Sequence, residues 1–154
     1  MDLRSAFQRI GSYLGKKRAN VQVRPANPLN DGNLPILLIV NAQAEETDLQ
    51  LGCVYVKIRA VEKINHSGVG GQDTANNPHA LTTAQTWAYQ QRIDGPQVLE
   101  AYESAEWTTE IELPEQVYGT YRGKNAFHIW EVKAGLQLDG KNAESNWMEI
   151  DIRK

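Results

Sequence analysis

The second half of the chain alternates between apolar and polar residues in three runs. Residues 106–113, 130–139 and 147–152 each place apolar side chains at every second position. Because successive side chains of a strand point to opposite faces of a sheet, this period of two predicts three strands, each with one apolar and one polar face. An apolar face needs a second layer to cover it, so the pattern predicts two packed sheets.

Further strands are predicted along the rest of the chain and bring the total to about eight. The additional runs are 21–24, 34–44, 52–64, 84–93 and 98–103. Asp94-Gly95-Pro96 is typical of a tight turn, which predicts that the last two runs form a hairpin. The fold class is therefore an all-β, two-sheet antiparallel β-sandwich.

Two segments depart from simple alternation. Residues 36–40 are apolar without interruption, which indicates a strand that is covered on both faces. Phe127 and Ile129 are apolar out of phase with Trp130 and Val132. This predicts either a β-bulge near Ile129 or a short segment that is covered on both faces.

The N-terminus has the period of a helix instead of a strand. The apolar positions follow a spacing of three and four: Leu3, Ala6, Phe7, Ile10, Tyr13 and Leu14. Such spacing gathers them on one helical face, and the basic cluster Lys16, Lys17 and Arg18 follows. We expect residues 1–18 to form an amphipathic helix with its basic cluster, and residues 19–154 to form a single sandwich domain.

This helix has two interpretations. In the first, it packs on the sandwich and covers the outer face of residues 36–40. In the second, it docks on a membrane surface or a partner, with Phe7 and Ile10 in contact and Lys16, Lys17 and Arg18 next to acidic groups.

Two connections are candidates for binding loops. Residues 65–83 are rich in Gly and Asn and have no periodicity, and loops of this length are usually functional or mobile. The connection 115–126 carries Tyr118, Tyr121 and Arg122, which we regard as candidate partner-binding residues.

Charge is distributed unevenly along the 154 residues. Residues 1–24 carry six Lys or Arg and one Asp, a balance of +5, whereas residues 25–154 carry ten Lys or Arg and eighteen Asp or Glu, a balance of −8. An acidic body argues against nucleic-acid binding. No apolar run has the length of a membrane span or of a signal-peptide core, so a cytoplasmic location is expected.

Residues with catalytic or metal-binding chemistry are sparse. The single cysteine, Cys53, excludes an internal disulfide and a cysteine-rich zinc site. None of the three histidines, His66, His79 and His128, pairs with another ligand at metal spacing. No Gly-x-Ser-x-Gly motif marks a nucleophile. We therefore expect a protein that is not an enzyme and that has no cofactor and no metal.

The second half of the chain resembles a known family. Residues 107–114 end in Leu113-Pro114, a loop with Tyr121-Arg122-Gly123 follows, and residues 128–138 form a long run of the type aromatic–x–Val–x–Ala–x–Leu. This arrangement resembles the arrestin-like sandwich and is similar to the retromer cargo-binding subunit and the bacterial sporulation-control arrestin-like proteins. Family members usually have two tandem sandwiches, whereas this chain has the length of one. A Tyr-x-Pro-Gly-type turn is also absent, and the N-terminal helix is additional.

The resemblance implies a non-enzymatic adaptor or scaffold that binds partners through sheet edges and loops. We therefore expect an interaction module whose partner is another protein or a second copy of the chain. One alternative is a carbohydrate- or small-ligand-binding sandwich that uses Trp87, Tyr118 and Tyr121, because flat rings stack on sugar faces. The other is a membrane-surface protein that docks through its N-terminal helix.

Overall fold

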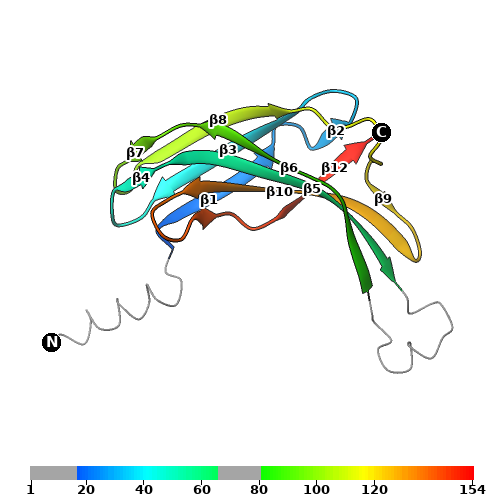
Figure 1. Cartoon of the computed structure of the whole chain (residues 1–154). Helices are drawn as coiled ribbons and strands as arrows, with labels where there is room; N and C mark the ends of the chain where they lie inside the picture. Colours follow the sequence, from blue (N-terminus) through cyan, green and yellow to red (C-terminus); the bar gives the residue numbers. More distant parts are fainter. Residues whose placement is uncertain (1–16, 66–80) are drawn as a thin grey trace, which may run out of the picture.

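A computed structural model describes residues 17–65 and 81–154 of the chain (Figure 1). Every regular element in these residues is a strand, as predicted. The strands are β1 Ala19–Pro25, β2 Leu29–Asp31, β3 Ile36–Ala44, β4 Leu49–Leu51, β5 Cys53–Asn65, β6 Leu81–Asp94, β7 Gln97–Leu99, β8 Ser104–Ile111, β9 Tyr121–Arg122, β10 Ala126–Gln137, β11 Ala143–Glu144 and β12 Met148–Arg153. The predicted N-terminal helix, including Phe7, Ile10 and Lys16, lies outside the described residues.

The strands form two main sheets. The smaller sheet has the order β1-β3-β8, and the larger has the order β2-β12-β10-β5-β6, with β9 and β11 also paired to β10. β4 and β7 form a separate two-stranded sheet. All pairs are antiparallel except β2 with β12, which is parallel.

The apolar core lies between the two main sheets, where inward side chains of alternating positions meet. From the larger sheet these are Val54, Val56, Ile58 and Ala60 of β5 and Trp130, Val132, Ala134 and Leu136 of β10; from the smaller sheet they include Ile36, Leu38 and Val40 of β3. These side chains are 0–1% exposed. The alternation predicted for residues 130–139 is therefore confirmed over β10, and the inward residues of β5 follow the same period of two.

Several local predictions differ from the structure. Residues 97–99 pair with β4 and not with β6, so the predicted hairpin around Asp94-Gly95-Pro96 is wrong. The four additional strands β2, β4, β9 and β11 have only two or three residues each, too short to show a period. β10 pairs with β5 without a register shift. The predicted bulge near Ile129 is therefore wrong. The alternative, a short segment that is covered on both faces, is confirmed, because Ile129 and Trp130 lie on opposite faces and are both buried.

The outer face of β3 also differs from the prediction. Leu37 is exposed and Ile39 is half-buried, whereas Leu38 and Val40 are fully buried. In the part of the chain that the structure describes, β3 is thus covered on one face only.

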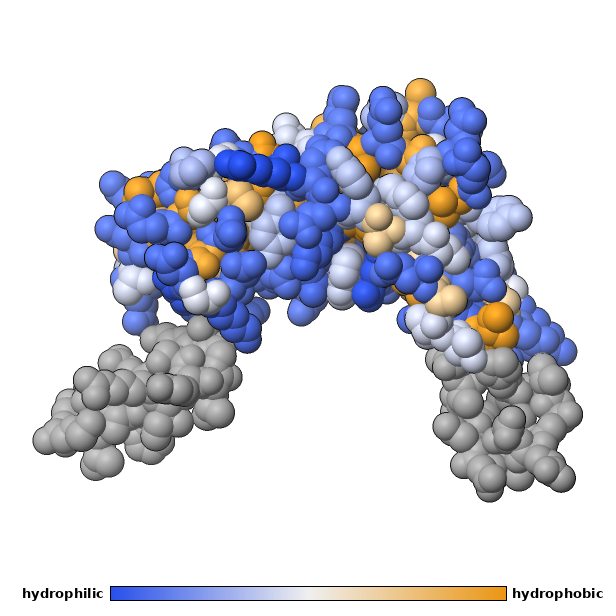
Figure 2. Space-filling model, viewed as in Figure 1, coloured by the Kyte–Doolittle hydropathy of each residue, from blue (hydrophilic) through white to orange (hydrophobic). Residues whose placement is uncertain are grey.

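The strands β5 and β6 are long, with 13 and 14 residues. Their ends near residues 65 and 81 extend past the smaller sheet (Figure 1). Apolar residues appear only in separate small patches on the face shown in Figure 2, and polar residues cover the rest. Within residues 17–65 and 81–154 we find no helix with the length and hydropathy that a membrane span requires.

Candidate functional site

The most exposed long strand of the sandwich is β6. It pairs with β5 along one edge, and no other described strand pairs with its second edge. Residues 82–90 are exposed apart from Trp87, which is half-buried. Unpaired backbone N–H and C=O groups along such an edge can pair with another strand.

The sequence of this edge has little of the usual protection against pairing. Natural edge strands are blunted by charged side chains, by proline, by β-bulges or by a short length. Residues 82–91 contain no charged residue and no proline. A register shift between Ala60 and Val61 inserts one additional β6 residue, Thr86, which is the only interruption in this stretch. The free edge of β6 is therefore long and chemically open.

The C-terminal end of β6 is fastened to β8. The Gln91 side-chain amide donates hydrogen bonds to the Thr109 hydroxyl and to the carbonyl oxygen of Glu110. Trp107 Nε1 donates to Asp94 Oδ2 at 3.1 Å. The Gly95 amide, together with the Gln97 and Trp107 side chains, holds the pKa of Asp94 below its ordinary value. β6 is thus anchored at residues 91–94, and at residues 83–90 its second edge pairs with no described strand.

A row of aromatic rings packs on the inner face of the larger sheet next to β6. Trp87 of β6 lies against Trp130 of β10, with ring centroids 5.6 Å apart, and it stacks on Tyr89 at 5.9 Å. Trp130 is fully buried, and its Nε1 donates to the Tyr118 carbonyl oxygen at 2.9 Å. Tyr89 remains 46% exposed. The open part of β6 therefore rests on a rigid base.

The row continues from Trp130 to His128, whose ring is fully buried. The Gly119 carbonyl can only accept a hydrogen bond, so the His128 Nδ1 that lies 3.0 Å from it carries a proton. His128 Nε2 lies 2.7 Å from the Thr86 hydroxyl. Both ring nitrogens of His128 therefore have hydrogen-bond partners within the fold, as is typical of a structural histidine.

The predicted site residues of the 115–126 connection gather at the far end of this row. Tyr121 stacks on His128 and Tyr118 meets it edge-on, with centroids 5.9 and 6.5 Å apart. Arg122 forms an ion pair with Glu149 and lies over the Phe127 ring. The structure therefore brings Tyr118 and Tyr121 together at His128, and it places the Arg122 side chain at Phe127 and Glu149 instead.

The basic residues Lys17 and Arg18 lie elsewhere. Both are exposed, and Arg18 Nη1 donates to the Asp139 carbonyl oxygen at 2.9 Å. Asp139 follows the C-terminal end of β10, whereas Tyr121 pairs with its N-terminal end. The two groups of predicted residues thus lie at opposite ends of one strand and do not form one site.

A groove lies where β6 and β8 diverge. Its volume is about 400 Å³, and its lining residues are Pro35, Trp87, Tyr89, Gln91, Glu110 and Glu112. Only Trp87 was a candidate from the sequence. Tyr89, Gln91, Glu110 and Glu112 were missed because they belong to two segments that the sandwich brings together. The sequence signal that points here is the uncharged run 82–91.

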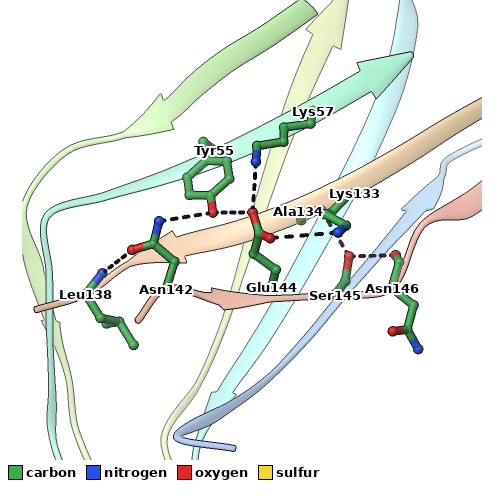
Figure 3. Close-up of polar contacts among 9 residues, drawn as sticks. All are labelled: Tyr55, Lys57, Lys133, Ala134, Leu138, Asn142, Glu144, Ser145 and Asn146. Atoms are coloured by element: carbon green, nitrogen blue, oxygen red, sulfur yellow. Dashed lines mark hydrogen bonds and ion pairs between the residues drawn. The ribbon is translucent and has the colours of Figure 1, made fainter. Parts of the chain in front are cut away.

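Part of the outer face of the larger sheet holds a polar network (Figure 3), and Lys57 of this network also lines a pocket of about 280 Å³ beside β6. The Tyr55 hydroxyl donates to Glu144 Oε2 at 2.6 Å, and Lys57 and Lys133 form ion pairs with the same carboxylate. Tyr55 packs against Gly135, where an added Cβ would meet the Tyr55 ring at 2.3 Å. Tyr55 was predicted to point outward; it does so, yet it is buried.

Burial and the Glu144 carboxylate raise the pKa of Tyr55. For Glu144, burial alone would raise the pKa, but the hydrogen bonds from Tyr55 and Lys57 and the charges of Lys57 and Lys133 hold it below its ordinary value. The network therefore fastens β11 to the outer face of β5 and β10.

Two further features of the described residues bear on chemistry. No group of three or more His, Cys, Asp or Glu side chains lies close enough to hold a metal ion in residues 17–65 and 81–154. Cys53 is half-buried, and its Sγ lies 3.3 Å from Gln137 Oε1.

Comparisons with known proteins were made at the level of sequence and of structure. No model of a known protein family matches the chain, and no curated protein matches its sequence. Among solved structures, the chain is similar to Spo0M, a sporulation control protein from Bacillus subtilis, with a TM-score of 0.63 and 12% sequence identity. The match covers 90% of this chain and 51% of Spo0M. The fold is that of the sporulation-control arrestin-like proteins. The chain spans about half the length of Spo0M, and at this identity the likeness shows the fold alone.

Proposed function

We propose that this chain is a non-enzymatic interaction module of arrestin-like type that binds a partner by accepting a β-strand at the free edge of β6. The observation that carries the proposal is the run of residues 83–91, which pairs with β5 and with no other described strand and contains no charge and no proline. Edge strands without such protection pair readily with other strands.

The surroundings of β6 favour binding over uncontrolled association. Anchoring by Gln91 and Asp94 and packing of Trp87 on Trp130 hold the edge in one conformation before a partner arrives. A preorganised edge lowers the entropic cost of association. The partner is an extended segment of another protein or the same edge of a second copy.

The proposal can be tested with random twelve-residue peptides displayed against the full chain. Hydrogen–deuterium exchange should then show protection of the amides of residues 82–90 when a selected peptide is bound. A strand pairs with one neighbour through the backbone N–H groups of every second residue. N-methylation of the residues whose N–H groups face β6 should therefore abolish binding, whereas N-methylation of the residues in between, the other phase, should preserve it. Equal effects of both phases, or selected peptides that leave residues 82–90 unprotected, would contradict the proposal.

Self-association through the same edge is the second form of this function. Sedimentation velocity of the full chain over a range of concentrations would detect it, and a selected peptide should compete with it. A dimer that persists in saturating peptide would place the contact between copies elsewhere.

Carbohydrate binding is the second candidate function, and one observation favours it. The Tyr118 side chain is 73% exposed, and it stands beside Tyr121 at 42%. Exposed rings of this kind stack on sugar faces, but one face of Tyr121 is already covered by His128. A glycan array probed with the chain and with Tyr118→Ala tests this candidate, and an array without signal would remove it.

A further inference from the structure

The groove beside the free edge indicates which side chains a partner strand would carry. This inference rests on the proposed function, because it concerns the partner of the same edge. A strand paired with β6 points alternate side chains to the inner and outer faces of the sheet. Trp87, Tyr89 and Gln91 point to the inner face, so the partner's inward side chains enter the groove between β6 and β8.

The wall of this groove opposite β6 is acidic. Glu110 and Glu112 both line it, and neither has an ion-pair partner among the residues that the structure describes. Other outer-sheet carboxylates, such as Glu131 and Glu144, are each paired with a cation. The groove thus leaves two negative charges available to a ligand.

The floor of the groove is aromatic. Trp87 is half-buried, and Tyr89 keeps 46% of its surface exposed. Aromatic faces attract cations, and the planar guanidinium group of arginine both stacks on such faces and pairs with carboxylates through two hydrogen bonds. The volume of about 400 Å³ lies within the range of ligand pockets, about 300–1,000 Å³.

From these observations we infer that the partner of β6 is an extended basic segment with an arginine side chain in the groove between Trp87, Tyr89, Glu110 and Glu112. The residues that would lie beside the partner's outward side chains, Gln85, Ala88 and Gln90, are uncharged. Lys57 and Arg59 of β5 line a pocket on the same outer face, but both form ion pairs with glutamates. Among the described residues that line a pocket beside β6, the carboxylates without an ion-pair partner are therefore those of Glu110 and Glu112 on the inner side. The negative balance of residues 25–154 also favours encounter with a basic segment over an acidic one.

The test begins with peptides selected by the full chain from the random twelve-residue library. We expect them to be enriched in arginine and depleted in proline, aspartate and glutamate. For one arginine-containing peptide, fluorescence anisotropy then compares the wild type with Glu110→Gln/Glu112→Gln. The double variant should weaken binding by about tenfold, because it removes both carboxylates that pair with the guanidinium group.

Two matched controls separate charge at the groove from net charge. Glu100→Gln/Glu103→Gln removes two exposed glutamates outside both β8 and the groove lining and should leave the affinity unchanged. Replacing the peptide arginine by citrulline, which keeps the shape but not the charge, should weaken binding to the wild type. It should weaken binding to Glu110→Gln/Glu112→Gln less, because only the attraction of the aromatic rings for the cation is then lost.

The outcomes distinguish this inference from the proposed function. Neutral or acidic peptides that pair in one N-methylation phase and bind Glu110→Gln/Glu112→Gln with unchanged affinity would overturn the arginine groove and leave edge pairing intact. Equal weakening by both double variants would also overturn it, since only net charge would then matter. Peptides that bind without protecting residues 82–90 would overturn both.

Discussion

Two free strand edges border the opening between the sheets, and they differ in sequence. β8 has eight residues and presents Glu106 and Glu110, whereas residues 82–91 of the longer β6 present no charge. Each pairs with one neighbour in the described chain, β8 with β3 and β6 with β5. Glutamates along an edge disfavour pairing with a second strand. The difference indicates that the glutamates keep the second edge of β8 unpaired, whereas the second edge of β6 can accept a partner strand.

The largest expected effect comes from removing the support of β6. Trp130→Ala deletes a fully buried ring that carries Trp87 and should lower the free energy of unfolding by about 3–5 kcal/mol. Chemical denaturation measures this loss. The matched control is Tyr118→Ala, whose side chain is 73% exposed and which should change stability by less than about 0.5 kcal/mol. Similar losses in both variants would show that the aromatic row does not support β6 in the way described.

A second prediction makes the β8 edge resemble that of β6. Glu106→Gln/Glu110→Gln removes both charges from β8 and should promote association between copies of the chain. Opposed like charges cost about 0.2–1 kcal/mol per cross-strand pair, so the concentration at which sedimentation velocity detects association should fall by about fivefold. Glu100→Gln/Glu103→Gln changes net charge equally outside β8 and should have no such effect. Equal association of the two variants would mean that net charge, and not the edge, prevents pairing.

The outer face of the larger sheet provides a pH-dependent prediction. The pKa of Glu144 is lower in the folded chain than its ordinary value of 4.5. Between these two pKa values the folded state binds fewer protons than the unfolded state. The contribution of Glu144 to the free energy of unfolding is therefore complete above pH 4.5 and is lost as the pH falls through the folded-state pKa of Glu144.

Tyr55→Phe removes the hydroxyl that donates to Glu144. It should cost about 1 kcal/mol at pH 7, and the difference from the wild type should shrink as the medium is acidified below pH 4.5. Denaturant unfolding at several pH values measures the difference. Tyr102→Phe, at an exposed tyrosine, is the control and should show no pH-dependent difference. If Tyr55→Phe lowers the free energy of unfolding by the same amount at every pH, the loss does not come from the hydrogen bond to Glu144.

The smallest expected effect concerns the far end of the aromatic row. Arg122 and Glu149 form an exposed ion pair, with side chains 59% and 44% exposed. Such pairs contribute little, so Arg122→Ala should change stability by less than about 0.5 kcal/mol and leave peptide binding at β6 unchanged. A tenfold loss of peptide affinity in Arg122→Ala would show that the peptide binds near Arg122, at the end of the aromatic row, and not at β6.

The long strands were predictable because their burial is periodic. The alternation of residues 52–64 and 130–138 reflects one sheet face in the core, and this pattern is local in sequence. Alternation does not specify partners, however. Residues 97–99 look like the return strand of a hairpin, yet they pair with β4, because register and partner depend on contacts between segments distant in sequence.

The candidate site was predictable only in part. Tyr118, Tyr121 and Arg122 were recognised as aromatic and basic residues of one loop. The structure brings the two tyrosines together around His128, whereas Arg122 contacts Glu149 and Phe127. The groove was not recognised, because Glu110 looks like an ordinary solvent-facing residue of β8. Glu110 and Tyr89 line one groove only because the fold places β8 and β6 on either side of it.

By itself, the sequence determined that this chain forms an all-β sandwich, because a period of two in hydrophobicity requires a sheet with one covered face. It also determined that residues 82–91 carry no charge. Only the tertiary structure decided that this run forms a free edge, since an edge is defined by which strands are missing beside it. The structure likewise placed two unpaired glutamates across from that edge, and neither fact is encoded in a local pattern.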